Sequence, residues 1–341
     1  QVDNTCRKLI RKEMAMDMSA GEKIYNELMA DLENEKYFNV SRIDHFKFNS
    51  PWLQFLFLSV KSIVSQLKRW FSEAPRRKSD TIFKQTGGIR TLFHNIFFSV
   101  LIHFRRVQLM NPKFYQLFDQ KEKYIYFPLH STNEYSTQVQ GTMWIDQLQI
   151  AQALAKSIPY DWKVIVKEHP GILLWRVRPS LFYEEIKKYS NVKLVKTDLS
   201  SNRLISHAQM IFTIVGTTGW EAIMRGKPVV SMERNMFDVL GLNRICTDLK
   251  ELSRAIYEEN ERIKTIPTQE RRRRIICLLT AIAKHGIWID APIKFIGEKE
   301  STPEERRPMA ELLAQGYKNY IEFRKINSSQ KNERFEYDGI R

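Results

Sequence analysis

The stretch MIFTIVGTTGWEAIMRGKPVV, residues 210–230, decides the fold. It begins with an apolar run, passes through a turn bounded by Gly216 and Gly219 into a helical segment, and ends in a second apolar run. Two short apolar runs separated by a helix are typical of a parallel β-α-β unit. We therefore predict strands at 210–215 and 229–232, joined by a helix at 220–225.

The same alternation of strands and helices extends upstream to about residue 122. Further strands are predicted at 124–129, 162–167 and 192–195, with helices at 144–157, 182–189 and 201–207. This pattern predicts an α/β fold with a Rossmann-like parallel sheet, in which ligands bind at the carboxyl ends of the strands. We expect a helical region at 1–120, the Rossmann-like domain at 121–255, and C-terminal helices and a tail at 256–341.

Composition supports a folded, intracellular protein. The 341 residues are 43% hydrophobic and 27% charged, which provides a core and excludes pervasive disorder. Three cysteines (Cys6, Cys246 and Cys277) are too few for a disulfide framework or a zinc ribbon, so a reduced, cytoplasmic compartment is expected. A net charge of +15 favours polyanionic partners, such as nucleic acid, anionic lipid or phosphate-bearing substrates.

Residues 46–120 carry most of this charge, with twelve Lys or Arg residues against three acids. The same segment contains the bulky apolar runs 51–64 and 91–110, which include too many polar residues for membrane spans. Basic residues among bulky apolar ones suit helices that lie on an anionic bilayer. The alternative is a pair of helices that pack on a neighbouring domain and expose a solvated basic face.

The turn after residues 210–215 is a candidate phosphate site. Gly216 and Gly219 allow a ligand to approach the backbone, and the first N–H groups of the next helix attract phosphate. Thr217 and Thr218 add hydroxyl donors, although Thr218 is also a plausible helix N-cap. Glu221 could bind ribose hydroxyls, or it could complete a capping box with Thr218.

Lys167-Glu168-His169-Pro170 follows the strand at 162–167. A lysine and a histidine at the end of a strand can neutralise a phosphate or protonate a leaving group. Pro170 favours an extended conformation for His169, which directs the ring into the crevice.

Two further pairs lie at predicted strand ends. His130 and Glu134 follow the first strand and suit acid–base chemistry, or equally a solvated surface loop. Ser200 and Ser201 follow the third strand, where they could donate to a ligand or cap the next helix, and capping is the favoured interpretation.

Several common signatures are absent from the sequence. There is no GxGxxG fingerprint, no GxxxxGK[ST] loop, no HExxH, no GxSxG elbow and no cluster of metal ligands. Hydride transfer, P-loop hydrolysis, zinc proteolysis and esterase chemistry are therefore disfavoured. We expect no metal and no cofactor.

The motifs FPLHSTNEYST, VIVKEHP, NVKLV, a Ser-Ser pair and MIFTIVGTTGWEAIMRGKPVV occur in this order over residues 124–250. Together they resemble the bacterial capsular polysaccharide synthesis family, which includes Kdo transferases. The resemblance implies a GT-B glycosyltransferase whose C-terminal Rossmann-like domain binds a nucleotide sugar without metal.

The resemblance also implies roles for individual residues. His169, with Lys167 and Pro170, would contact the donor phosphate, and Thr217 and Thr218 would hold phosphate or nucleotide. Glu221 would orient the ribose or the helix start, and His130 and Glu134 would lie near the reacting sugar as candidate catalytic groups. The remaining candidate nucleotide- or phosphate-binding residues are Ser200, Ser201, Gly216 and Gly219.

One departure from the family pattern concerns residues 1–120, which do not read as the N-terminal Rossmann-like domain of a GT-B enzyme. Either an upstream half is missing, or a helical, membrane-facing module replaces it.

We predict a glycosyltransferase of capsule or surface-polysaccharide synthesis that uses a CMP-activated ulosonic acid in preference to a UDP-sugar. The acceptor would be a saccharide or lipid-linked glycan, at the inner face of the cytoplasmic membrane. The alternatives are a UDP-sugar 2-epimerase-like enzyme and a non-catalytic basic protein that binds membrane or nucleic acid. Nucleic acid is disfavoured as a partner because no RNP-like aromatic residues or helix-turn-helix are visible.

Overall fold

The computed structural model describes most of the chain from residue 18 to residue 285. The described residues are 18–34, 51–72, 89–111, 114–119, 121–131, 134–169 and 178–285, with 311, 314, 315 and 318. Pro170 and the segment 286–310 lie outside them, so the predicted effect of Pro170 on His169 stays a prediction.

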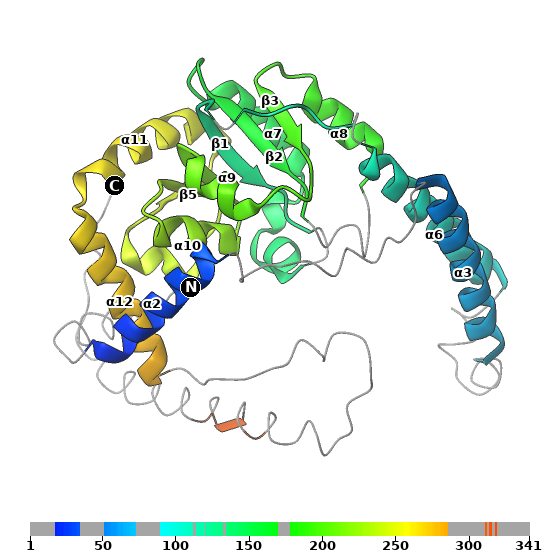
Figure 1. Cartoon of the computed structure of the whole chain (residues 1–341), viewed down its shortest axis with the longest axis horizontal. Helices are drawn as coiled ribbons and strands as arrows, with labels where there is room; N and C mark the ends of the chain where they lie inside the picture. Colours follow the sequence, from blue (N-terminus) through cyan, green and yellow to red (C-terminus); the bar gives the residue numbers. More distant parts are fainter. Residues whose placement is uncertain are drawn as a thin grey trace. The chain divides into compact units, whose positions relative to one another are not determined.

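Within the described residues, six parallel strands form one sheet in the order β3-β2-β1-β4-β5-β6. Figure 1 labels β1, β2, β3 and β5 of this sheet. The strands are β1 (Tyr124–Pro128), β2 (Lys163–Lys167), β3 (Val192–Val195), β4 (Met210–Thr213), β5 (Val229–Ser231) and β6 (Arg244–Ile245). This is the strand order of the Rossmann fold. The predicted fold class is confirmed, and the five predicted strands are present within one or two residues of their expected ends.

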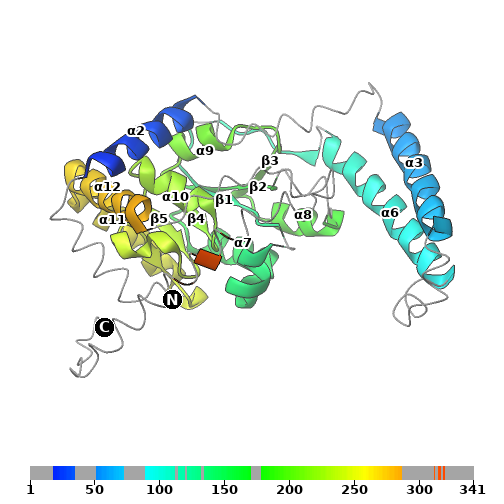
Figure 2. The ribbon, with the colours of Figure 1, turned by 90° about the horizontal axis from the view of Figure 1, so that it is seen from below.

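The sheet is covered by helices on both faces. Figure 2 shows α7 (Gln147–Ser157) and α8 (Ser180–Lys187) on one side and α9 (Ser201–His207) on the other. The helices α10 (Thr217–Met224) and α11 (Leu252–Thr265) complete the layers. Because both faces are covered, the strands are almost continuously apolar, as buried parallel strands are.

The core forms where alternate strand residues meet the helices. Ile125 and Phe127 of β1 are fully buried against Leu154 of α7 and Ile186 of α8. On the opposite face, the Tyr124 hydroxyl donates to the backbone carbonyl of Leu204 in α9 at 2.8 Å. The remaining short elements are η4 (Ser136–Gln140), η5 (Thr142–Trp144), η7 (Met236–Leu240) and η8 (Leu249–Glu251).

Two long helices, α3 (Pro51–Ser72) and α6 (Ile89–Met110), form an antiparallel hairpin. The ring of Phe55 near the start of α3 lies 6.3 Å from that of Phe104 near the end of α6, and Ser62 hydrogen-bonds Ser99 midway. Leu109, near the end of α6, belongs to the sheet's apolar core. No helix in the described ranges combines the length and apolarity that crossing a bilayer requires.

Contacts divide the chain into two compact units. One comprises residues 31–237 and 241–267, and the other comprises 1–30, 238–240 and 268–341. Most of α2 (Ser19–Glu33) and all of α12 (Thr268–His285) belong to the second unit. These helices pack closely at Gly21, where a Cβ atom would overlap the Thr280 side chain. The predicted boundaries at 120 and 255 stay a prediction.

Candidate active site at the carboxyl edge of the sheet

Most of the polar residues predicted to form the site follow the carboxyl ends of neighbouring strands. His130 follows β1, Lys167 and His169 lie at the end of β2, and Gly216 follows β4. Since β1 lies between β2 and β4, these three strand ends are adjacent. The winding of the chain reverses between β1 and β4, and open parallel sheets bind ligands in the crevice at such a reversal.

His130 connects the end of β1 to the end of β4. Its backbone N–H donates to Gln147 Oε1 at 2.8 Å, and Gln147 Nε2 donates back to its carbonyl at 3.0 Å. Its ring nitrogen Nε2 lies 3.3 Å from Thr213 Oγ1 and accepts from the Val215 N–H at 3.4 Å. A Cβ atom on Gly216 would stand only 3.0 Å from Nε2, so the ring requires glycine at this position.

The His130 ring is neutral at pH 7. Burial lowers its pKa to about 4, with further lowering by the positive charges of His169 and Arg178. Because the Val215 N–H donates to Nε2, that nitrogen carries no proton. The histidine therefore acts as a fixed, neutral acceptor that holds the turn after β4.

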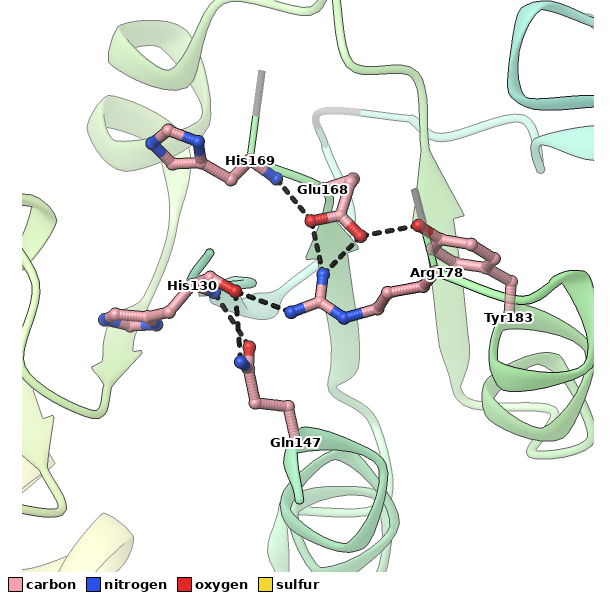
Figure 3. A network of polar contacts seen from close by, with 6 residues as sticks. All are labelled: His130, Gln147, Glu168, His169, Arg178 and Tyr183. Atoms are coloured by element: carbon pink, nitrogen blue, oxygen red, sulfur yellow. Dashed lines mark hydrogen bonds and ion pairs between the residues drawn. The ribbon is translucent and has the colours of Figure 1, made fainter. Parts of the chain in front are cut away.

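A buried ion pair supports the backbone that carries both histidines (Figure 3). The Glu168 carboxylate, 1% exposed, pairs with Arg178 at 2.5 Å and accepts from the Tyr183 hydroxyl at 2.6 Å and the His169 N–H at 2.8 Å. Arg178 also donates to the His130 carbonyl at 2.5 Å. Both imidazole rings point away from the ion pair, toward the same side (Figure 3).

The charges of this pair depend on each other. Burial alone would lower the pKa of Arg178, but the Glu168 carboxylate outweighs it and the pKa is raised. Burial also raises the pKa of Tyr183, and the nearby carboxylate raises it further. Tyr183 therefore stays protonated and donates. Loss of one charge would leave the other buried without compensation.

A second polar group lies on the α9 face of the sheet. Lys167, 3% exposed, donates from Nζ to Ser201 Oγ at 2.7 Å, and the Tyr126 hydroxyl donates to the same oxygen at 3.3 Å. Glu221 of α10 interacts electrostatically with both Lys167 and Tyr126. The structure thus brings three of the predicted site residues together here: Lys167, Ser201 and Glu221.

Burial brings the pKa values of Lys167 and Glu221 closer to neutral pH. It lowers the pKa of Lys167 to about 8, although the carboxylates of Asp198 and Glu221 oppose this effect. It raises the pKa of Glu221 to about 7, against the opposing charges of Arg225 and Lys167. Both groups can therefore change protonation when a charged ligand arrives, which is common at functional sites.

The helix α10 presents its N-terminus at this edge. Its N-cap is Gly216, which offers no side-chain hydrogen bond, and the helix begins at Thr217. The predictions that Thr218 is the N-cap and that it forms a capping box with Glu221 are therefore wrong. The N–H groups of Thr217 and Thr218 lie in the first turn, where no earlier helical carbonyl can accept from them, and such groups attract anions.

A model of the family described as "Capsule polysaccharide biosynthesis protein" matches residues 99–260. The resemblance inferred from the motifs at 124–250 is confirmed, and the family segment also includes the end of α6. A comparison with curated proteins gave no match.

Solved structures of glycosyltransferases are also similar to the chain. The beta Kdo 2,4 transferase of Thermosulfurimonas dismutans KpsC is 21% identical, with a TM-score of 0.33 over 48% of this chain and 45% of that one. Its beta Kdo 2,7 transferase is 19% identical, with a TM-score of 0.30 over 45% and 51%. Anabaena Alr3699/HepE in complex with UDP-glucose is 16% identical, with a TM-score of 0.31 over 54% and 47%. The chain spans about half the length of these proteins.

The other predicted residues of the capsule-family segment have distinct positions. Ser200 is the N-cap of α9 and accepts from the Arg203 N–H at 3.2 Å, as favoured from the sequence. Glu134 is exposed, and its carboxylate accepts from Ser136 Oγ at 3.4 Å. In the described part of the chain, Glu134 belongs to neither hydrogen-bonded group. Gly219 is buried, and the Phe237 ring packs so closely on it that a Cβ atom would have no room.

Sequence reasoning missed the roles of Arg178, Tyr183 and Gln147. An acidic residue in Lys-Glu-His-Pro at a buried strand end is a signal for a buried cationic partner. The sequence offers no means of choosing Arg178 among many basic residues. No group of metal ligands occurs among the residues that the structure describes.

Proposed function

We propose that this protein is a glycosyltransferase of capsule or surface-polysaccharide synthesis that binds a nucleotide-activated sugar at the carboxyl ends of β1, β2 and β4. The observation that carries the proposal is the junction of β1 and β4, where His130 holds the turn that starts α10. This junction presents open helix N–H groups beside a buried lysine. The family match at residues 99–260 supports the same conclusion.

The donor phosphate would lie against the first turn of α10. The N–H groups and hydroxyls of Thr217 and Thr218 would donate to it, and His169 and Lys167 would supply positive charge. Glu221 would accept from the ribose hydroxyls. These fixed donors would stabilise the charge that develops on the departing nucleotide without a metal.

In the transfer step, an acceptor hydroxyl attacks the anomeric carbon of the donor sugar. The bond to the nucleotide phosphate breaks, and the hydroxyl proton passes to a base. His130 and Glu134 are the proposed catalytic pair: Glu134, which is exposed where an acceptor can reach it, is the proposed base, and His130, whose Nε2 accepts from the Val215 N–H, positions the turn beside the reacting sugar. Proton transfer by a positioned side chain contributes typically about 10²–10⁴-fold to a rate.

We propose a CMP-activated ulosonic acid as the donor and a saccharide or lipid-linked glycan as the acceptor. The resemblance of the motifs to Kdo transferases supports CMP over UDP. The basic α3–α6 segment supports an anionic membrane as the place of reaction, at the inner face of the cytoplasmic membrane. The matched structures include one in complex with UDP-glucose, so UDP is the competitor to test.

A thermal-shift titration tests the proposal, using CMP, UDP and a random oligonucleotide as ligands. We expect CMP to raise the melting temperature of the wild-type protein and of His207→Ala, and to have no effect on His169→Ala. His207 is a matched control because it is an exposed histidine at the end of α9. A response to UDP alone would indicate a UDP-sugar enzyme, and a response to the oligonucleotide alone would refute the sugar-transfer proposal.

A further inference from the structure

The α3–α6 hairpin exposes large apolar side chains along its whole length. On α3 these are Trp52, Leu53, Leu56, Phe57, Val60, Val64, Leu67 and Phe71, and on α6 they are Ile89, Phe93, Phe97, Phe98 and Phe104. Exposure ranges from 36% for Leu67 to 66% for Phe71. Contiguous exposed apolar surface of this kind marks an interaction site.

The spacing of these residues makes one stripe on each helix. Successive residues are about 100° apart around an α-helix, so spacings of three and four keep the stripe on one side. The residues that face the other helix, such as Ser62 and Phe55 on α3 and Ser99 on α6, form a separate stripe. Two of the exposed residues lie off the exposed apolar stripes: the Trp52 ring lies 6.2 Å from the Phe104 ring, and the Phe98 ring lies 4.3 Å from the His94 ring, between ring centroids.

The two apolar stripes face the same side of the hairpin. On each helix, the exposed apolar stripe is displaced around the axis from the stripe that faces the other helix. Viewed from each helix's own N-terminus, this displacement has the same direction of rotation on both helices. Because the helices are antiparallel, this common direction brings both stripes to one side. The rest of the α3 surface is polar: Lys61 and Lys68 flank the apolar stripe, and Ser65 and Ser72 lie farther around the helix. The hairpin therefore has one apolar face that is two helices wide.

The charges of the hairpin have one sign. Neither helix contains an acidic residue, and together they contain six basic ones: Lys61, Lys68, Arg69, Arg90, Arg105 and Arg106. A broad apolar face combined with basic residues outside it matches an anionic lipid surface. Basic side chains near such a surface are attracted to its anionic lipids.

We propose that the α3–α6 hairpin lies in the plane of an anionic bilayer, with its apolar face at the boundary between headgroups and acyl chains. An upright orientation would place Lys61, near the middle of α3, at the bilayer centre, where a lysine is costly. The in-plane orientation leaves Lys61 and Lys68 among the headgroups. This inference rests on the membrane partner proposed above, and nucleotide binding is measured separately.

Vesicle flotation of the full chain tests the proposal with two matched pairs of substitutions. Leu56→Asp/Val60→Asp places two charges on the apolar face, and Ser65→Asp/Ser72→Asp places the same charges on the polar face of the same helix. All four residues are exposed, so neither pair disturbs a core. We expect the first pair to reduce binding to phosphatidylglycerol-containing vesicles at least tenfold, and the second to reduce it no more than threefold.

Probes along α3 distinguish the in-plane orientation from a spanning one. In the full chain with its three native cysteines replaced by alanine, Leu53→Cys, Val60→Cys, Phe71→Cys or Ser65→Cys carries a spin label, and accessibility to oxygen and to a nickel chelate reports depth. We expect equal depth for the labels at 53, 60 and 71, and a shallower label at 65. A label at 60 that is much deeper than those at 53 and 71 would overturn the in-plane proposal.

Two other results would also overturn it. If both Asp pairs weaken flotation equally, the hairpin binds through charge alone. If the wild-type chain fails to float and instead forms a dimer that Leu56→Asp/Val60→Asp dissociates, the apolar face binds a second copy. In either case, the response to CMP is unaffected, so the proposed sugar transfer is judged independently.

Discussion

The sheet edge and the α3–α6 hairpin depart from ordinary protein surfaces in opposite ways. At the edge, ionisable groups such as Glu168, Arg178 and Lys167 are buried and held in hydrogen bonds. On the hairpin, large apolar groups such as Phe71 and Phe93 are exposed. Folding alone favours neither arrangement. We propose that they are two binding surfaces, a polar one for a small charged ligand and an apolar one for lipid.

Removal of Arg178 should have the largest effect at the sheet edge. Arg178→Met leaves the Glu168 carboxylate buried without its partner, which typically costs about 3–5 kcal/mol. We expect a loss of this size in the free energy of unfolding, measured by urea denaturation. On the hairpin, Leu56→Asp should change the same quantity by less than about 0.5 kcal/mol.

The double variant Arg178→Met/Glu168→Gln is the control for this prediction. It removes both charges, so it should be more stable than Arg178→Met alone. A loss below about 1 kcal/mol in Arg178→Met would contradict the view that the ion pair fixes the edge.

Crowding at the turn after β4 should have an intermediate effect. Gly216→Ala introduces a Cβ atom at 2.7 Å from Thr213 Oγ1 and 3.0 Å from His130 Nε2. Overpacking of this kind costs about 1–3 kcal/mol. We expect lower stability in calorimetry and loss of the thermal shift with CMP. Full retention of both would show that His130 does not set the position of the turn.

Protonation of Glu221 should have the smallest effect, visible in the pH dependence of stability. Its pKa is raised from 4.5 to about 7, so between these values the folded state holds more protons than the unfolded state. The free energy of unfolding therefore falls as pH rises through this window. Glu221→Gln should remove this decline, which is at most about 1.4 kcal/mol for each pH unit of the window.

Chemical denaturation at pH 4.5, 5.5, 6.5 and 7.5 measures this effect. Glu184→Gln on the exposed side of α8 is the control and should follow the wild-type curve. An unchanged decline in Glu221→Gln would place its origin elsewhere.

Sequence patterns predicted the sheet well because its strands are buried on both faces. The runs at 124–129 and 164–166 are apolar, and each is followed by polar residues. β6 was missed because a two-residue strand, Arg244–Ile245, carries no periodic signal. The start of α10 was placed too late because the Thr-Thr-Gly sequence favours a threonine cap, whereas the helix begins at Thr217 with Gly216 as its N-cap.

The candidate site was only partly predictable. Motifs placed His130, Lys167 and His169 at strand ends, and the strand order brings these ends together. The pairing of Glu168 with Arg178 depends on the tertiary fold, since the two residues approach from different elements. The apolar character of residues 46–120 was visible in the sequence, but the shared face of α3 and α6 depends on their antiparallel pairing.

Hydrogen exchange of the full chain, followed by mass spectrometry, tests the existence of two separate surfaces most directly. CMP should slow exchange in peptides that cover residues 163–169 and 213–221 and leave residues 51–72 unchanged. Anionic vesicles should slow exchange in residues 51–72 and 89–110 and leave the sheet edge unchanged. Protection of the hairpin by CMP, or no protection of the edge, would contradict the account.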